Sequence, residues 1–320
     1  DGVYGVLAGL EVVHSLNDAG IETEAPLEVI CWTNEEGARF APAMIGSGVF
    51  SGDFSLDYAH NQSDVDGKTM GEELARIGYL GEEEPGGHEL GFHFEAHIEQ
   101  GPILEAEKRP VGIVTGVQGI RWYNVRIRGM EAHAGPTPME MRKDSIVAAA
   151  KLIQHLDDNA LGEGPHGRTT VKVDHCLPAG TRNTISSDVL LTVDIRHPDR
   201  NAFERMDAGL RWAATKIGVR KKVEIEVEEI WVSPPVEFDE GCVNAVRKGA
   251  ELLGYDHMDM VSGAGHDAVY VSKVAPTAMI FVPCEGGISH NEIENATQSD
   301  LEAGCNVLLH AMLDRAVTAS

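Results

Sequence analysis

The sequence has no long apolar run. None of its apolar stretches approaches the ~18–20 residues that a membrane-spanning helix requires. The opening residues, DGVYGVLAGLEVVH, lack the basic region that begins a secretory signal peptide. We therefore expect neither a membrane partner nor a secretory leader.

Basic residues are also scarce. The chain has 26 Lys and Arg against 51 Asp and Glu, a formal net charge of −25. Such a surface repels nucleic acid and anionic membranes, so we expect neither as a partner. A solvated acidic surface that aids solubility is the simplest interpretation, and adaptation to high salt stays open. The sign of the substrate does not follow, because a local pocket can oppose the global field.

Cysteines are few and show no pairing pattern. The five residues Cys31, Cys176, Cys242, Cys284 and Cys305 are widely spaced, odd in number and contain no CxxC motif. This distribution indicates a reducing compartment, which we take to be the cytoplasm, rather than a disulfide framework. Most of these thiols are expected to be small core residues.

The order of expected elements predicts two domains. The 320 residues, 42% of them apolar, suffice for two ordinary cores. A helix pattern ending at Gly20, a strand over LEVICWT and a strand candidate in GFHFEAHIEQGP begin an α/β domain, which resumes after Pro234-Pro235. The strands and helices between follow a β-α-β-β-α-β order, typical of a ferredoxin-like unit. We therefore predict an α/β domain, residues 1–114 and 233–320, with an inserted α+β domain, residues 115–232.

Potential metal ligands follow the expected strands of the α/β domain. Glu35-Glu36 follows LEVICWT, His97 stands at the end of a strand candidate, and His290 follows MIFVP and a Gly pair. Adjacent carboxylates can divide the work between binding a metal and accepting a proton. Taken singly, each residue is better explained as a surface side chain. Together they favour a hydrolytic metal centre, for which carboxylate and imidazole are suitable ligands.

Eight short motifs, taken in order along the chain, resemble those of one enzyme family. The strings DGVYGVLAGLE, TNEEGARFAPAMIGSGVF, HIEQGP, TGVQGIRW, HAGPTPM, RNTI…DIRHPD, SGAGHDA and GGISHNE resemble, in order, the motifs of N-carbamoyl-L-amino acid hydrolases. Allantoate amidohydrolases and β-ureidopropionases are similar. The resemblance covers essentially the whole chain. It implies a zinc-peptidase-like mixed sheet for the catalytic domain, with the inserted domain serving as lid and dimerisation domain.

The resemblance also implies roles for single residues. Two divalent ions, zinc first, with manganese, cobalt or nickel also compatible, would be held by Asp1, Glu36, His97 and His290. Glu35 would be the general base, and His133 would stabilise the oxyanion, in this family often from the other subunit of a homodimer. Asn183 and Arg196 would grip the substrate carboxylate. His266, next to Asp267, would support the site near substrate or metal. Apart from the resemblance, we expect Gln100 and Gln118 to line the substrate pocket.

Judged by residue type alone, each of these roles has a simpler alternative. His133 and Asn183 could be turn residues, and Arg196 could be an exposed charge at a strand end. Asp1 could be a disordered terminus. The family pattern also has a His ligand in an H-x-D stretch upstream of the bridging Asp, which here is residue 1. On that basis we expect this chain to hold its second metal weakly, and to be a weak or inactive hydrolase, because each missing ligand lowers the affinity for the metal.

The expected reaction is hydrolysis of the carbamoyl C–N bond of an N-carbamoyl-L-amino acid, giving amino acid, ammonia and carbon dioxide. Hydrolysis of allantoate or another ureido acid is the main alternative, and a peptidase or aminoacylase is the third. A non-catalytic dimeric scaffold is an alternative of another class. The joint presence of Glu35, Glu36, His97 and His290 argues against that scaffold, which has no use for them.

Overall fold

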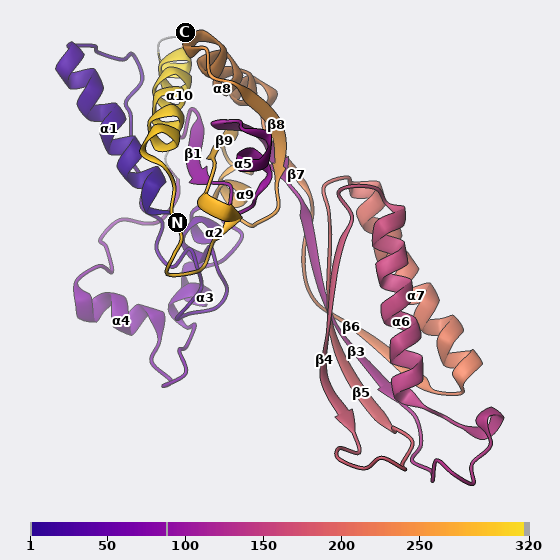
Figure 1. The fold of residues 1–320 in the computed structure, drawn as a ribbon. Helices are drawn as coiled ribbons and strands as arrows, with labels where there is room; N and C mark the ends of the chain where they lie inside the picture. The colour runs from indigo at the N-terminus through magenta and orange to yellow at the C-terminus, as the bar shows by residue number, and fades with distance from the viewer. Residues whose placement is uncertain (1, 88, 317–320) are drawn as a thin grey trace. The chain divides into compact units, whose positions relative to one another are not determined.

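The computed structural model describes residues 2–87 and 89–316; the expected ligand Asp1 lies outside the described residues. The chain divides into two compact units, residues 1–117 with 237–320 and residues 118–236 (Figure 1). These boundaries fall a few residues after the expected ones. No helix among the described residues is both long and apolar enough to cross a membrane.

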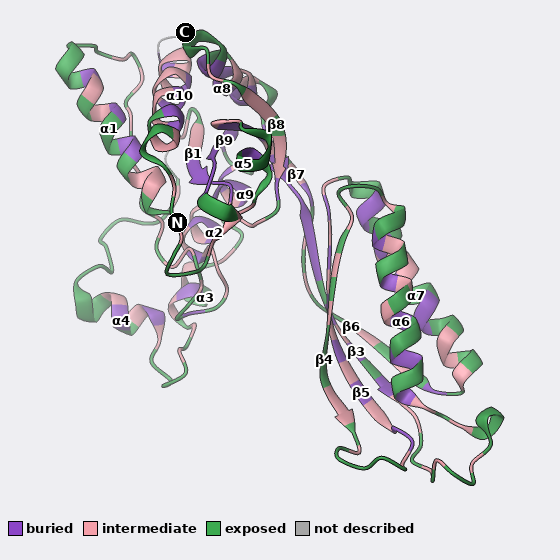
Figure 2. Ribbon diagram, in the orientation of Figure 1, coloured by how far each residue is buried: buried purple, intermediate pink, exposed green. Residues whose placement is uncertain are grey.

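The first unit is built on a mixed sheet whose strands run in the order β1-β9-β2-β7, with β8 also paired to β2. Strand β1 is parallel to β9, and β9 is antiparallel to β2. Every residue of β9 is buried, as expected for a central strand with helices packed on it (Figure 2). The elements of this unit are α1 Val3–Ala19, α2 Ile45–Phe50, α3 Leu56–His60, α4 Met70–Ile77, β1 His93–Ile98, α5 Ile103–Glu107, β2 Val111–Val117, β7 Val236–Glu237, α8 Glu240–Leu253, β8 His257–Ser262, α9 Ala268–Val271, β9 Thr277–Val282 and α10 Gln298–Ala316.

Local sequence explains where the helices of this unit stop and start. Helix α1 ends at Gly20, whose φ of 63° is left-handed and closes the last turn without the penalty of a Cβ atom. Helix α8 begins after Asp239, whose carboxylate accepts the Cys242 backbone N–H. The end of α1 at Gly20 is the one expected from the sequence.

The strand predicted over LEVICWT is wrong. Residues 27–32 lie outside any strand, although β-branched and aromatic residues favour one there. A strand requires a partner backbone, and among the described residues no segment forms a ladder with this one.

The second unit is ferredoxin-like, as predicted. Its antiparallel sheet has the order β4-β5-β3-β6, and helices α6 and α7 pack together and on the sheet. Buried and half-exposed residues alternate strictly along β5, so one face carries the core and the other does not. The core includes Tyr123, Leu152 and Leu191. The elements are β3 Gly119–Arg128, α6 Ser145–Gly162, β4 Arg168–Leu177, β5 Asp188–His197, α7 Arg200–Lys221 and β6 Glu224–Ser233.

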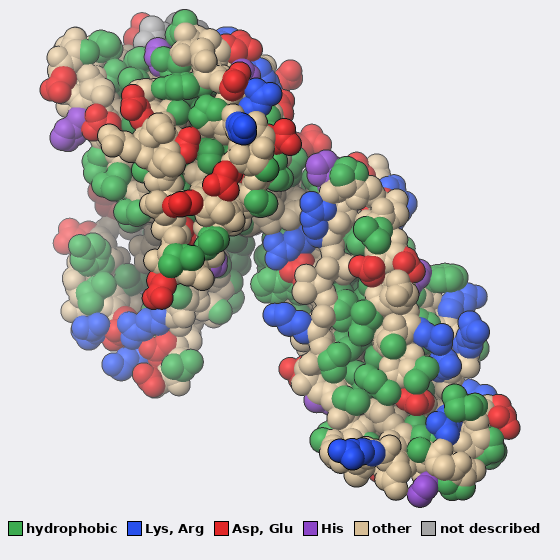
Figure 3. All heavy atoms as spheres, in the orientation of Figure 1, with side chains coloured by type: hydrophobic (Ala, Val, Ile, Leu, Met, Phe, Trp, Pro, Cys, Tyr) green, Lys and Arg blue, Asp and Glu red, His purple; other side chains and the backbone are tan. Residues whose placement is uncertain are grey.

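Acidic side chains are spread over both units on the face drawn in Figure 3. All five cysteines are free thiols. Cys242 and Cys284 are buried, Cys176 and Cys305 are half-buried and Cys31 is exposed, so the expectation that most of them lie in the core is wrong.

Candidate active site

A hydrogen-bonded loop presents the paired glutamates. The Asn34 amide donates to the Phe40 carbonyl at 2.7 Å, and the Met44 N–H donates to the Glu35 carbonyl at 2.7 Å. Gly37 has a φ of 65°, and a Cβ there would lie 2.7 Å from the Ala43 nitrogen, so only glycine fits. The loop therefore holds Glu35 and Glu36 in defined positions.

Glu36 and His290 come together from distant parts of the chain. Glu36 Oε1 lies 3.5 Å from His290 Nε2, and both side chains are more than half exposed. Two ligands of one tetrahedral zinc, each about 2.05 Å from the ion, stand about 3.4 Å apart. The observed spacing therefore fits two ligands of a single metal ion.

His97 is buried at the end of β1 with one ring nitrogen engaged by the backbone. Its Nδ1 lies 2.7 Å from the Ile98 carbonyl oxygen, and the side chain is 7% exposed. A carbonyl partner on Nδ1 fixes the tautomer in the way that second-shell groups orient metal-binding histidines. His97 would accordingly ligate through Nε2.

Three carboxyl groups with raised pKa values gather beside His97. Burial, followed by the charges of Asp267 and Glu36, raises the pKa of Glu35 to about 7. Burial and then the charge of Asp267 raise the pKa of Glu95 to about 7, although Glu95 also accepts the Ala268 N–H at 2.8 Å. Burial raises the pKa of Asp267 to about 6, and the Ser47 hydroxyl donates to this carboxylate.

Crowded carboxylates of this kind favour protons or a cation. Sequence reasoning missed Glu95. Its signal was available, because Glu95 and His97 stand two residues apart on β1 and so point to the same side of the strand.

His266 occupies a supporting position. It is 1% exposed, its Nε2 lies 2.8 Å from the Ser262 hydroxyl, and its Nδ1 lies 3.7 Å from Glu95. Its ring centroid is 4.8 Å from that of His97. Burial holds the pKa of His266 well below its usual range, so the ring is neutral. Both nitrogens face protein groups, which favours support of its neighbours over direct contact with substrate.

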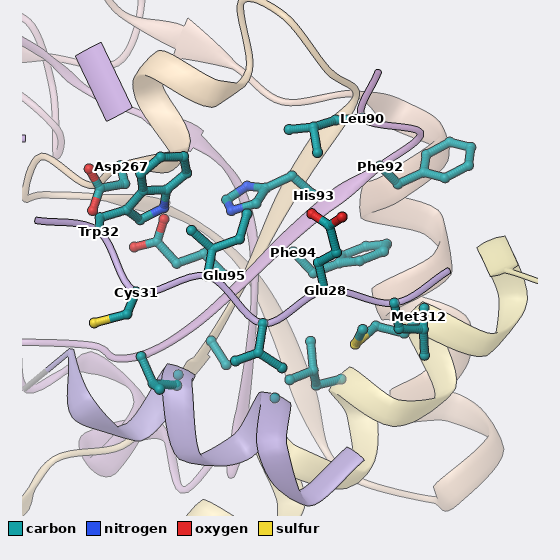
Figure 4. Close-up of a pocket in the computed structure, with 18 of the residues that line it drawn as sticks. Glu28, Cys31, Trp32, Leu90, Phe92, His93, Phe94, Glu95, Asp267 and Met312 are labelled. Carbon is teal, nitrogen blue, oxygen red and sulfur yellow. The ribbon is translucent and has the colours of Figure 1, made fainter. Parts of the chain in front are cut away.

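A largely apolar cavity of about 630 Å³ adjoins these carboxylates. Figure 4 shows Glu95 and Asp267 toward one end and Phe92 and Met312 toward the other. His93 also lines it, and burial lowers the pKa of His93 to about 4. This surrounding explains why desolvation is the largest influence on the pKa of Glu95.

The remaining expected residue of the first unit, Gln100, lies by the loop that carries His290. Its backbone has a φ of 57°, and its amide Nε2 donates to the Ser289 hydroxyl at 3.2 Å. Gln118, at the start of the second unit, is buried.

No group of three His, Cys, Asp or Glu side chains within residues 2–87 and 89–316 is arranged as a ready metal cluster. The donor chemistry still fits a metal, because Glu36 and His290 have the spacing of two ligands and the tautomer of His97 is fixed. The crowded carboxyls of Glu35, Glu95 and Asp267 point the same way.

The second unit brings His133 and Asn183 together. His133 forms an isolated bridge with Thr184, and the Ala134 N–H donates to the Asn183 carbonyl at 2.7 Å. Both side chains are exposed, and His133 Nδ1 accepts the Gly135 N–H at 3.1 Å. The two residues can therefore act on one ligand.

Arg196 lies far from that pair within one chain. Asn183 precedes β5, whereas Arg196 stands near its other end, eight residues beyond Asp188. At about 3.3 Å per residue the strand between them spans about 26 Å. One small substrate cannot reach Asn183 and Arg196 of the same second unit.

Comparison with known proteins agrees with this picture. The family model described as Peptidase family M20/M25/M40 matches residues 1–314. An N-carbamoyl-L-amino-acid amidohydrolase of Rhizobium meliloti is 48% identical over 99% of this chain and 76% of its own length. An allantoate amidohydrolase of Bacillus subtilis is 32% identical over 96% of this chain and 75% of its own. A hydantoinase/carbamoylase-family amidase of Burkholderia multivorans, solved as a crystal structure, is 55% identical with a TM-score of 0.95, covering all of this chain and 78% of its own.

The fold, with its carboxylate and imidazole chemistry, defines a hydrolase that has a mixed α/β unit and an inserted α+β unit. The chain belongs to peptidase family M20/M25/M40, among relatives that include carbamoyl-amino-acid and allantoate amidohydrolases. The resemblance inferred from the sequence motifs is thereby confirmed.

Proposed function

We propose that this protein is an amidohydrolase that cleaves the carbamoyl C–N bond of N-carbamoyl-L-amino acids with the help of divalent metal ions. The observation that carries the proposal is the Glu36–His290 pair at ligand spacing beside Glu35, whose pKa is raised to about 7. The 48% identity to the Rhizobium meliloti enzyme supports the choice of substrate. Allantoate is the alternative substrate, supported by a relative of lower identity.

Metal binding is assigned to residues of the first unit. Glu36 and His290 would hold one ion and His97 the other, with Asp1 as the residue proposed to bridge them. When bound, the ions supply Lewis-acid activation of the carbamoyl group and of water. Zinc is the first choice, and manganese, cobalt and nickel are compatible with the same ligands.

Glu35 is the proposed proton carrier. A carboxyl group whose pKa lies near the working pH can both accept and return a proton. Glu35 takes a proton from the water that attacks the carbamoyl carbon. It then delivers this proton to the leaving nitrogen as the C–N bond breaks. The carbamate that results decomposes, so the products are amino acid, ammonia and carbon dioxide.

Substrate recognition is assigned to the second unit. Arg196 would bind the substrate carboxylate through its guanidinium, and Asn183 would add an amide contact. His133 would donate to the oxyanion. Because Asn183 and Arg196 lie at opposite ends of β5, they can serve one substrate only if two copies of the chain contribute to each site. We therefore propose a homodimer.

The experiment is ammonia release from N-carbamoyl-L-amino acids and from allantoate by the wild type and Glu35→Gln. We expect the substitution to lower kcat by at least about a hundredfold, the usual size of a lost general base. Glu11→Gln, an exposed position on α1, is the matched control and should retain the wild-type rate. Equal rates for wild type and Glu35→Gln would contradict the assigned role, and faster turnover of allantoate would select the alternative substrate.

A further inference from the structure

The face of the second unit's sheet that points away from its helices carries a linked set of polar side chains. Asp194 and Arg196 lie two residues apart on β5, hence on the same face, and Trp122 of β3 stands directly opposite Asp194. We propose that Asp194 is a positioning residue that fixes the guanidinium of Arg196 for the substrate carboxylate. This inference rests on the proposed function of Arg196.

Asp194 binds one defined edge of the guanidinium. Arg196 Nε donates to Asp194 Oδ1 at 2.9 Å, and Nη2 donates to Oδ2 at 2.8 Å. This side-on fork uses Nε and Nη2. The end-on edge, formed by Nη1 and Nη2, is the other edge that can bind a carboxylate through two parallel hydrogen bonds.

Asp194 is itself held in place. The Trp122 indole N–H donates to Asp194 Oδ2 at 2.9 Å, and the Trp122 ring lies against Trp231 with centroids 4.9 Å apart. The backbone carbonyl of Asp194 also accepts the Thr169 hydroxyl at 3.1 Å. The short, anchored carboxylate of Asp194 therefore restrains the long Arg196 side chain, which otherwise has many rotamers.

Because a second arginine lies beside Arg196, affinity alone does not test whether Asp194 positions the guanidinium. Arg168 pairs with Arg196 across β4 and β5, so removal of the Asp194 charge makes this region more positive. That change strengthens attraction for any anion, whatever its stereochemistry. A fixed guanidinium edge, in contrast, places the carboxylate precisely and so helps to distinguish L from D substrates. The ratio of the two affinities isolates positioning from charge.

The same strand supplies a matched control. Arg126 Nε donates to Asp188 Oδ1 at 3.1 Å, and Nη2 donates to Oδ2 at 2.7 Å. This pair has the same side-on geometry at the opposite end of β5. Asp188→Asn therefore removes an equivalent ion pair without touching Arg196.

The experiment measures the dissociation constants of N-carbamoyl-L-leucine and N-carbamoyl-D-leucine by calorimetry on the full chain, for wild type, Asp194→Asn, Trp122→Phe, Arg196→Lys and Asp188→Asn. We expect the preference for the L form to fall about tenfold in Asp194→Asn, the scale of a lost charge-assisted hydrogen bond. Trp122→Phe should lower it less, and Asp188→Asn should leave it unchanged. Thermal unfolding verifies that each variant is folded.

The outcomes separate the two claims. If Arg196→Lys lowers affinity and the L preference but Asp194→Asn leaves the ratio intact, Asp194 does not position Arg196, whereas the role of Arg196 stands. An equal loss in Asp188→Asn would show a general effect on the sheet and also overturn the inference. If Arg196→Lys changes neither quantity, or if the wild type binds neither ligand, the proposed function of Arg196 fails and the inference fails with it.

Discussion

Replacement of Glu95 by Gln should change how the stability of the first unit depends on pH. Gln keeps an acceptor oxygen for the Ala268 N–H but carries no charge. The pKa of Glu95 is raised from 4.5 to about 7, chiefly by burial. Folding therefore favours the protonated form. The stability that this gives is fully present below about pH 4.5 and is lost as the pH rises through 7.

The size of the effect follows from the shift. A shift of about 2.5 pH units corresponds to about 3 kcal/mol, and this is an upper bound because Asp267 and Glu35 share the same field. Glu95→Gln has no such loss. Relative to the wild type, its free energy of unfolding should therefore rise by up to about 3 kcal/mol between pH 4 and pH 8.

The assay is urea unfolding in metal-free buffer, read by hydrogen exchange of the β9 amides, which are buried in the first unit. Glu251→Gln, an exposed position on α8, is the control and should follow the wild type. If the free energy of unfolding depends on pH in the same way for wild type and Glu95→Gln, the reasoning is refuted. Such a result would mean that ionising Glu95 does not destabilise the folded protein.

Two further changes test other parts of the site. His290→Ala removes one of two side chains at ligand spacing, so it should weaken zinc binding at least about tenfold in a competition titration. The control His60→Ala, on α3, should leave zinc binding unchanged. Equal zinc affinities for the two variants would argue against His290 as a ligand. Gly37→Ala introduces a Cβ atom 2.7 Å from the Ala43 nitrogen at a φ of 65°. It should therefore destabilise the first unit by about 1–3 kcal/mol and lower the rate of ammonia release. An unchanged unfolding midpoint would mean that the loop shifts freely to accommodate the methyl group.

Elements with strong local signals could be predicted from the sequence. Helix α1 and its end at Gly20 follow from apolar spacing and a glycine stop, and the β-α-β-β-α-β order of the second unit follows from alternating strands and amphipathic helices. Strand β8, with the mixed sequence HMDMVS, lacks such a signal and was missed. The segment LEVICWT has strand propensity, but pairing depends on a partner far away in the sequence, and propensity contains no information about it.

The same distinction holds for the site. Residue types and motif order marked Glu35, Glu36, His97 and His290, and the structure places Glu36 beside His290. The burial that raises the pKa of Glu95 depends on packing from several elements, so sequence gave no measure of it.

The separation of Asn183 from Arg196, in contrast, follows from the length of β5 alone.

The most direct test of the central claim is ammonia release from an N-carbamoyl-L-amino acid by the chelated protein before and after reloading with zinc or manganese. We expect no release from the chelated protein and release after reloading, with ammonia formed in amounts equal to the amino acid. Release that persists without metal, or amino acid formed without ammonia, would contradict metal-dependent hydrolysis of the carbamoyl group.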